Sequence, residues 1–235
     1  MPALPPDEVS TLLAGRSGQP DRFHSRLSPV AARAVFGGFD PDELTNEIVA
    51  QVRKLQAAGI QVTHLDTHKH THIFPSILKA LVKAARICGV AAIRNPFVPA
   101  NTLHMRRFRG NPALWKRLGQ VRVLRTFAGT FRERMRKSGL ASPDGIVGVI
   151  ETGAFSLERV REALQDLPEG TWELVCHPGY NDDDLQRANT RLLESREKER
   201  QILISPELRT FLEEQEIGLI SYRDLARSQS STATA

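Results

Sequence analysis

The stretch that decides the fold runs Thr63-His64-Leu65-Asp66-Thr67-His68-Lys69-His70-Thr71-His72-Ile73-Phe74-Pro75. It holds four of the seven histidines of the chain within nine residues, and Asp66 shares their even-numbered positions. Side chains two residues apart point to the same face of an extended strand. We therefore expect His64, Asp66, His68, His70 and His72 to gather wherever the extended conformation persists. Imidazoles that converge with a carboxylate are typical of a divalent-metal site or of acid–base catalysis.

A histidine-rich solvated loop, or an adventitious metal trap, is the alternative interpretation of this run. We favour a functional one because the run follows the strand-like Ile60-Gln61-Val62 and ends at Pro75, a typical helix start. Catalytic residues of α/β enzymes lie where a strand gives way to a polar apex and then to a helix.

The composition indicates one globular α/β domain, which we place at residues 1–226, followed by a disordered tail at 227–235. Of the 235 residues, 40% are hydrophobic and 25% are charged, which allows an ordinary core. Cys88 and Cys176 form no CxxC pair and indicate a reducing compartment. We find no signal peptide, and no apolar run approaches the ~18–20 residues of a membrane span. We therefore expect a cytoplasmic protein.

Strands and helices alternate in the predicted order, which indicates parallel βαβ units in a barrel or an open sheet. Residues 1–39 are expected to be loop with at most a short helix. Predicted helices begin at Asp40-Pro41, Pro75, Ser156 and Ser205-Pro206, and another extends to Ile202. Predicted strands cover residues 60–65, 90–93, 145–150, 172–176 and 217–222.

A basic region extends from Arg106 to Lys137, with eleven Lys or Arg residues and one acid, Glu133. Such a region could face nucleic acid or an anionic membrane. We favour the polar side of one or two amphipathic helices, because Leu114, Leu118 and Val121 repeat at helical spacing. Since no nucleic-acid motif accompanies the charge, we expect no nucleic-acid partner.

His177 is the second notable histidine, because it directly follows the predicted strand that ends at Cys176. It could be a structural residue, or it could protonate a leaving group, since the pKa of imidazole lies near neutrality. The sequence contains no G-x-S-x-G, P-loop, G-x-G-x-x-G or H-E-x-x-H motif. Serine hydrolases, nucleotide-binding enzymes and zincin proteases are therefore not supported, and a metal-assisted hydrolase remains.

Three spaced motifs, in the right order, resemble the YdjC-like carbohydrate deacetylases, which include chitooligosaccharide and hopanoid-biosynthesis deacetylases. The first is the histidine run up to Pro75, the second is Val175-Cys176-His177-Pro178-Gly179-Tyr180, and the third is Ser221-Tyr222-Arg223-Asp224-Leu225. Arg94, after the second predicted strand, also agrees. The resemblance covers residues 40–226 approximately.

The resemblance implies a deformed (β/α) barrel of the glycoside hydrolase/deacetylase type that removes acetyl groups from N-acetylated amino sugars or oligosaccharides. It implies a divalent metal, Mg²⁺ as commonly described for the family, although histidine ligands also suit Zn²⁺. His68 corresponds to the first histidine of the family's H-x-H-x-H run and is the predicted metal ligand. We predict His177 and Asp66 as catalytic residues. The predicted substrate contacts are His70, His72, Arg94 and Tyr180.

The sequence departs from the family at its beginning. The family's first two strands carry an Asp-Asp-Phe-Gly segment and a G-x-H histidine, and residues 1–39 contain neither. A misplaced start codon, a truncated gene and a genuinely shortened protein all explain this. We expect a barrel that lacks its first two strands, with impaired metal binding, little activity and exposed edges that could favour a homo-oligomer.

Two other functions remain open at this point. A non-catalytic sugar-binding or regulatory relative would explain the missing acids, but not the intact histidine motifs. A metal-dependent phosphoesterase on the same kind of barrel would release phosphate and not acetate.

Overall fold

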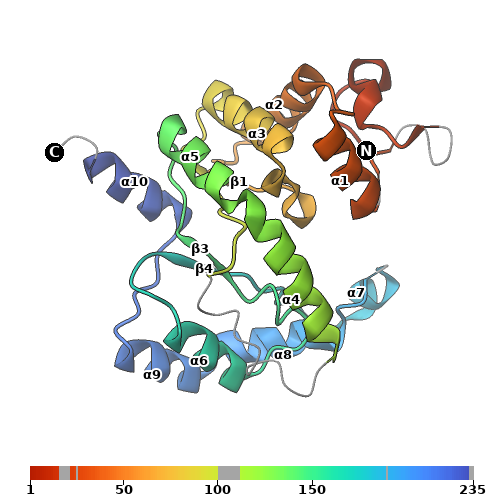
Figure 1. Cartoon of the computed structure of the whole chain (residues 1–235). Helices are drawn as coiled ribbons and strands as arrows, with labels where there is room; N and C mark the ends of the chain where they lie inside the picture. The colour runs from red at the N-terminus through yellow and green to blue at the C-terminus, as the bar shows by residue number, and fades with distance from the viewer. Residues whose placement is uncertain (16–21, 25, 100–111, 189, 233–235) are drawn as a thin grey trace. The chain divides into compact units, whose positions relative to one another are not determined.

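The structure is a computed structural model, and it describes residues 1–15, 22–24, 26–99, 112–188 and 190–232. The chain divides into two compact units, shown with their elements in Figure 1, whereas the sequence suggested a single domain. Unit 1 comprises Met1–Pro96, Thr126–Ser142 and Ser221–Ala235, and unit 2 comprises Phe97–Arg125 and Pro143–Ile220.

Unit 1 is built from helices around one short parallel strand pair. Strand β1 (His64–Leu65) pairs with β2 (Ala92–Ile93), and Ala92 also bridges Ala141 in parallel. Helix α3 makes the crossover that a parallel pair requires. The remaining elements of this unit are η1 (Pro6–Leu12), α1 (Leu27–Phe36), α2 (Pro41–Ala57), η3 (His68–Ile73), α3 (Pro75–Cys88), α5 (Ala128–Ser138) and α10 (Tyr222–Thr232).

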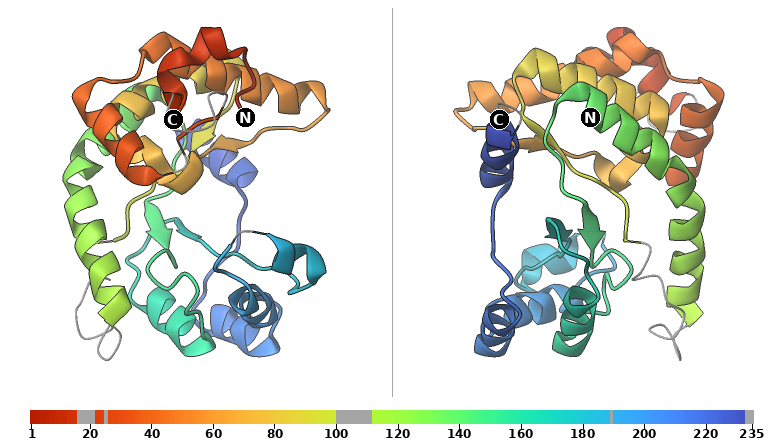
Figure 2. Two further views of the ribbon diagram at one scale, coloured as in Figure 1. Left: turned by 90° about the vertical axis from the view of Figure 1, so that its right-hand side faces the viewer. Right: turned by 60° about the vertical axis from the view of Figure 1, so that its left-hand side comes forward.

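Helices α2 and α3 lie side by side, as Figures 1 and 2 show. The predicted start of α2 is confirmed, because the Asp40 side chain accepts hydrogen bonds from the Asp42 and Glu43 amides. The predicted start of α3 at Pro75 and its stop at Gly89 in the left-handed conformation are also confirmed. Both ends are local features that side-chain chemistry alone can specify.

The N-terminal segment is more ordered than the sequence suggested. Residues 6–12 form the 3-10 helix η1 and residues 27–36 form α1, where mostly loop was expected. Val9, Leu12 and Leu13 are buried in one apolar cluster. The carboxylate of Glu47, itself only 3% exposed, accepts hydrogen bonds from the Ala3 and Leu4 amides. These long-range contacts attach the N-terminal segment to α2, and no local sequence pattern predicts them.

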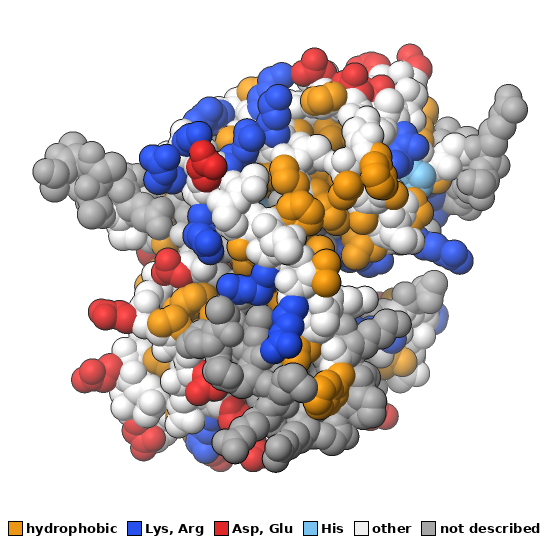
Figure 3. All heavy atoms as spheres, viewed as in Figure 1, with side chains coloured by type: hydrophobic (Ala, Val, Ile, Leu, Met, Phe, Trp, Pro, Cys, Tyr) orange, Lys and Arg blue, Asp and Glu red, His pale blue; other side chains and the backbone are white. Residues whose placement is uncertain are grey.

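The basic region is amphipathic in its described part. Leu118, a member of the predicted apolar stripe, is buried, and on α5 Phe131 and Met135 are buried as well. Arg86 of α3 donates hydrogen bonds to the carbonyls of Lys137 and Ser138 and thereby joins α3 to the end of α5. Figure 3 shows Lys and Arg side chains over this part of unit 1, where the exposed ones are Lys79, Lys83, Arg86, Arg132, Arg136 and Lys137. The beginning of the region, residues 100–111, lies outside the described residues.

Unit 2 contains a second parallel pair, in which β3 (Gly145–Val147) pairs with β4 (Trp172–Leu174). Helix α6 makes the crossover, and Ser156 caps it as predicted by accepting a hydrogen bond from the Arg159 amide. Helices α6 and α9 lie side by side over a shared apolar cluster (Figure 1). The helices of this unit are α4 (Pro112–Leu124), α6 (Leu157–Gln165), α7 (Asp183–Arg187), α8 (Glu194–Leu203) and α9 (Pro206–Glu214), and η6 (Arg125–Phe127) lies at the boundary with unit 1.

The strand predicted at residues 217–222 was wrong. Within the described residues no strand forms there, Leu219 and Ile220 are exposed, and Tyr222 begins α10. Residues 227–232, expected in a disordered tail, continue α10, which buried Leu225 holds against Ala92 and Ala141. The α/β class is confirmed, and the deformed barrel that lacks its first two strands stays a prediction. None of the described helices is both long and apolar enough to cross a membrane.

We predict that Glu47→Ala lowers the free energy of unfolding by about 2 kcal/mol, because it leaves the Ala3 and Leu4 amides without their acceptor. Urea unfolding measures the change. The control is Glu8→Ala in η1, where the side chain is exposed and the expected change is within about 0.5 kcal/mol. Equal stability of both variants would contradict this assignment of Glu47.

Candidate active site

The histidine run leaves the extended conformation soon after β1. Thr67 is still extended (φ −123°, ψ 151°), but residues 68–73 form the 3-10 segment η3. Lys69 and His70 both have φ +54°, in the left-handed backbone region that residues other than glycine rarely adopt. The extended conformation, on which the predicted common face depended, persists only to Thr67, because two consecutive left-handed residues turn the chain back.

This turn brings His70 to Asp66. The Nδ1 atom of His70 lies 3.2 Å from Oδ1 of Asp66, and Arg94, at the end of β2, donates from Nη1 to Oδ2 of the same carboxylate. Partial burial raises the pKa of Asp66, but the hydrogen bond from His70 and the positive charge of the Arg94 guanidinium act against it, and the pKa lies below its usual value. Asp66 is therefore ionised at neutral pH. Two of the predicted site residues meet this predicted catalytic carboxylate.

His72 is completely buried, and both of its ring nitrogens are engaged. Nε2 lies 3.0 Å from the carbonyl oxygen of Arg94 and must donate to it, because a carbonyl only accepts. Nδ1 lies 2.8 Å from Oγ1 of Thr67, which already accepts from the His72 amide and the Thr71 hydroxyl, and so donates its proton to the ring. Burial is the main cause that lowers the pKa of His72 to about 4. The neutral ring of His72 thus links Thr67 to the backbone of Arg94 by hydrogen bonds inside the protein.

His64 and His68 lie on either side of Asp66 along the chain. The His64 ring stacks on Tyr222, with centroids 3.8 Å apart and planes 7° from parallel, so it contacts the start of α10. His68, the predicted metal ligand, is exposed. Within the described ranges, no three His, Cys, Asp or Glu side chains lie close enough together to hold a metal ion. The residues present therefore do not form a complete metal site, and the role of His68 stays a prediction.

His177 and Tyr180 belong to unit 2, where they follow β4. The His177 amide donates to Oε2 of Glu199 at 2.5 Å, and the Arg200 guanidinium lies 4.6 Å from the centroid of the Tyr180 ring. Burial first, then the negative charges of Glu199 and Glu173, raise the pKa of neighbouring Cys176. The predicted roles of His177 and Tyr180 are not tested by this geometry.

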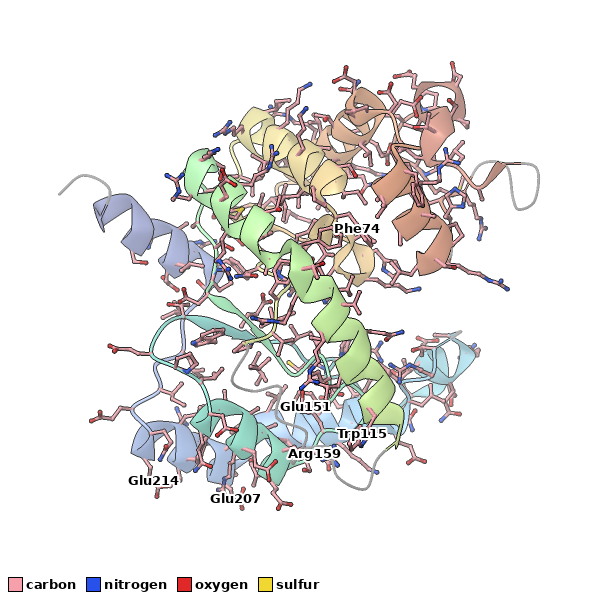
Figure 4. The ribbon with its side chains drawn as sticks, viewed as in Figure 1. Phe74, Trp115, Glu151, Arg159, Glu207 and Glu214 are labelled. Carbon is pink, nitrogen blue, oxygen red and sulfur yellow. The ribbon has the colours of Figure 1, made fainter. Side chains whose placement is uncertain are left out.

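Another polar group follows β3 in the same unit. Glu151 is buried, and it lies near Gly148, Phe155 and Arg159; Figure 4 labels Glu151 and Arg159. Because β3 and β4 are parallel neighbours, the segments that follow them leave the same edge of the pair.

Sequence reasoning missed Thr67 and Glu199. Thr67 was seen only as a spacer between Asp66 and His68, although its hydroxyl organises the turn. Glu199 belongs to the highly charged Glu-Ser-Arg-Glu-Lys-Glu-Arg of α8, which is typical of a solvated helix. Its position, five residues after Glu194 and two after Glu197, gives no local signal of burial.

A family model described as YdjC-like protein matches residues 1–214 of this chain. A carbohydrate deacetylase of Thermoanaerobacter pseudethanolicus is 23% identical over 221 residues, which cover 94% of this chain and 72% of that protein. Carbohydrate deacetylase 1 of Listeria innocua is 28% identical over 207 residues, which cover 87% of this chain and 69% of the relative. A carbohydrate deacetylase of Listeria monocytogenes serotype 4a is 29% identical over 79% of this chain and 61% of its own length.

Among solved structures, one from Enterococcus faecalis V583, provisionally described as a cellobiose-phosphate cleavage protein, superposes with a TM-score of 0.69. It shares 21% sequence identity and matches 95% of this chain and 72% of the other. At this identity the likeness establishes the α/β fold alone.

The burial of neutral His72 predicts a pH dependence of stability. Its pKa is about 4 in the fold and about 6.5 in the unfolded chain, so the unfolded state binds the proton first. The contribution is complete above pH 6.5 and is lost as pH falls toward 4, by about 3 kcal/mol in all. Urea unfolding at several pH values measures it. In His72→Gln, whose amide Nε2 can still donate to the Arg94 carbonyl, this part of the slope should vanish; the same slope in both proteins would contradict the assignment.

The left-handed conformation of Lys69 predicts an unusual glycine effect. Lys69→Gly should raise the free energy of unfolding by about 0.5–1 kcal/mol, since glycine adopts φ +54° without the steric cost. The same change in the exposed interior of α3, Lys79→Gly, should lower it by about 1 kcal/mol. Thermal or urea unfolding of the two variants compares them. A loss of stability in both would mean that residue 69 does not hold this conformation in solution.

Proposed function

We propose that this chain, which belongs to the YdjC-like protein family, is a hydrolase that removes acetyl groups from N-acetylated amino sugars. Its curated relatives are named carbohydrate deacetylases, and the match to the family model extends over most of the chain. The sugar itself is proposed only as a class, an N-acetylated amino sugar or its oligosaccharide.

The observation that carries this proposal is the contact between Asp66 and His70. An ionised carboxylate only accepts, so the 3.2 Å contact means that His70 carries its proton on Nδ1. Nε2 of the neutral ring then has a lone pair, and the side chain is 21% exposed. A carboxylate that orients an imidazole in this tautomer is a recurrent arrangement for a general base.

These contacts suggest a division of roles that differs from the sequence prediction. Asp66 has a lowered pKa and is held by Arg94, so it is a weak base. We assign it the orientation of His70, whereas His70 takes the proton from water. The water oxygen attacks the acetyl carbonyl carbon, the carbon–nitrogen bond breaks, the amine takes up a proton as it leaves, and His70 gives its proton to solvent. On its sequence motif alone, His177 is proposed as a donor of the proton to the amine.

A divalent metal, Mg²⁺ or Zn²⁺, is proposed as the cofactor on the family resemblance, and it would supply Lewis-acid activation of the carbonyl. His68 is the ligand that this chain is proposed to offer. Because the described residues gather no three donors, we expect weak metal binding and low activity, and no step above depends on the metal. The same finding favours a second candidate, a sugar-binding relative without catalysis.

We predict that the purified chain with added Mg²⁺ or Zn²⁺ releases acetate from N,N′-diacetylchitobiose, and that His70→Gln and Asp66→Asn each lower kcat by about 100-fold with little change in KM. Quantification of free acetate measures this. The matched control is His24→Gln, which changes a histidine outside the described contacts of Asp66 with His70, His72 and Arg94 and should leave kcat unchanged.

Chelation tests the metal in the same assay. Removal of divalent cations and His68→Ala should each reduce acetate release, and added metal should restore only the wild-type chain. Undiminished activity after chelation would refute metal dependence. No acetate from a folded chain would refute the deacetylase; binding of the intact sugar would then identify the non-catalytic relative, and phosphate release from sugar phosphates would identify a phosphoesterase.

A further inference from the structure

Helix α8 holds the segment after β4 at three successive points. The His177 amide donates to Oε2 of Glu199, and the Gly179 amide donates to the carbonyl of Arg196 at 3.3 Å. The guanidinium of Arg200 covers the Tyr180 ring. One face of a single helix therefore fixes the whole His177-Pro178-Gly179-Tyr180 segment.

Glu199 differs from the other two contacts, because it is an ionisable side chain with no exposed surface. Only one of its carboxylate oxygens has a hydrogen-bond partner within the described residues; Oε1 is buried without one. A buried carboxylate that is only half satisfied is destabilising, and an apolar or amide side chain of similar size is often tolerated better. The fold alone gives no reason for a carboxylate here.

The contact of Glu199 is with the backbone of His177 at 2.5 Å, a short charge-assisted hydrogen bond. Such a bond fixes the peptide plane before His177, and with it the position and direction of the Cα–Cβ bond that carries the imidazole. A reacting group needs this constraint, since a displacement of about 1 Å can reduce a rate by about 100-fold.

We propose that Glu199 is a positioning residue that fixes the Cα–Cβ bond from which the His177 imidazole extends, at a cost in stability. The inference rests on the proposed function, in which His177 protonates the leaving amine. Glu199 touches neither substrate nor reacting atoms in this role and acts only through the His177 backbone.

The first test compares Glu199→Gln with the wild-type chain in acetate release and thermal unfolding. The amide is isosteric but uncharged, so its hydrogen bond to the His177 amide is weaker. We expect kcat to fall about tenfold with little change in KM, while the melting temperature stays the same or rises. The matched control is Glu214→Gln on α9, an exposed side chain that projects from the ribbon in Figure 4, and neither quantity should change.

Glu199→Asp is the second variant, because it keeps the charge and shortens the side chain by one methylene. It should also lower kcat, since the carboxylate no longer reaches the His177 amide at the same distance. Unchanged kcat in both variants, or a parallel loss of kcat and melting temperature in Glu199→Gln, would overturn the proposal.

A second readout does not depend on catalysis. In ring ¹H–¹³C NMR spectra, with the His177 signals assigned from their absence in His177→Gln, Glu199→Gln should shift the His177 signals and leave those of His64, His70 and His72 in place. Glu214→Gln should shift none of them. Identical His177 signals in Glu199→Gln and wild type would overturn the positioning role even in an active enzyme. An inactive wild type with the expected shift would refute only the proposed function.

Discussion

The turn that follows β1 depends on one neutral imidazole. His72 accepts from the Thr67 hydroxyl and donates to the Arg94 carbonyl, so it joins the turn to the end of β2. The same two segments carry Asp66 and the Arg94 guanidinium, which therefore meet. A protonated ring would have no lone pair for Thr67, and its charge would be buried. The arrangement around Asp66 thus requires that His72 stays uncharged.

The helix ends of this chain could be predicted from sequence because their causes are local. Asp40, Ser156 and Ser205 each accept from an amide two or three residues ahead, and that interaction needs nothing from the rest of the fold. The failure at residues 217–222 has the opposite cause. An apolar run forms a strand only where it can pair with a neighbouring strand and bury its side chains in a core. Leu219 and Ile220 are instead exposed.

The sequence indicated which segment brings histidines near Asp66, but it did not indicate their geometry. Composition alone identified the segment that carries Asp66, His70 and His72. The alternation of histidines with other residues could not predict their arrangement, because it implies a common face only in an extended backbone. Lys69 and His70 adopt a left-handed conformation that residues other than glycine rarely adopt. His72, a predicted substrate contact, has no exposed surface, which favours an architectural role. Only the three-dimensional contacts distinguish an imidazole that holds the fold from one that can take a proton.

Two buried ionisable side chains, His72 and Glu199, differ in how the free-energy cost of their burial is offset. Both are fully inaccessible. His72 satisfies both ring nitrogens and avoids charge, so its burial costs little, and its loss would detach one segment from another. Glu199 leaves one oxygen without a partner among the described residues, so its burial opposes folding. Burial by itself therefore does not separate structural from functional polar groups. The two kinds of group differ in their hydrogen bonding. A buried polar group whose atoms all have hydrogen-bond partners is explained by the fold, whereas a group with a partner for only one of its atoms requires a reason outside the fold.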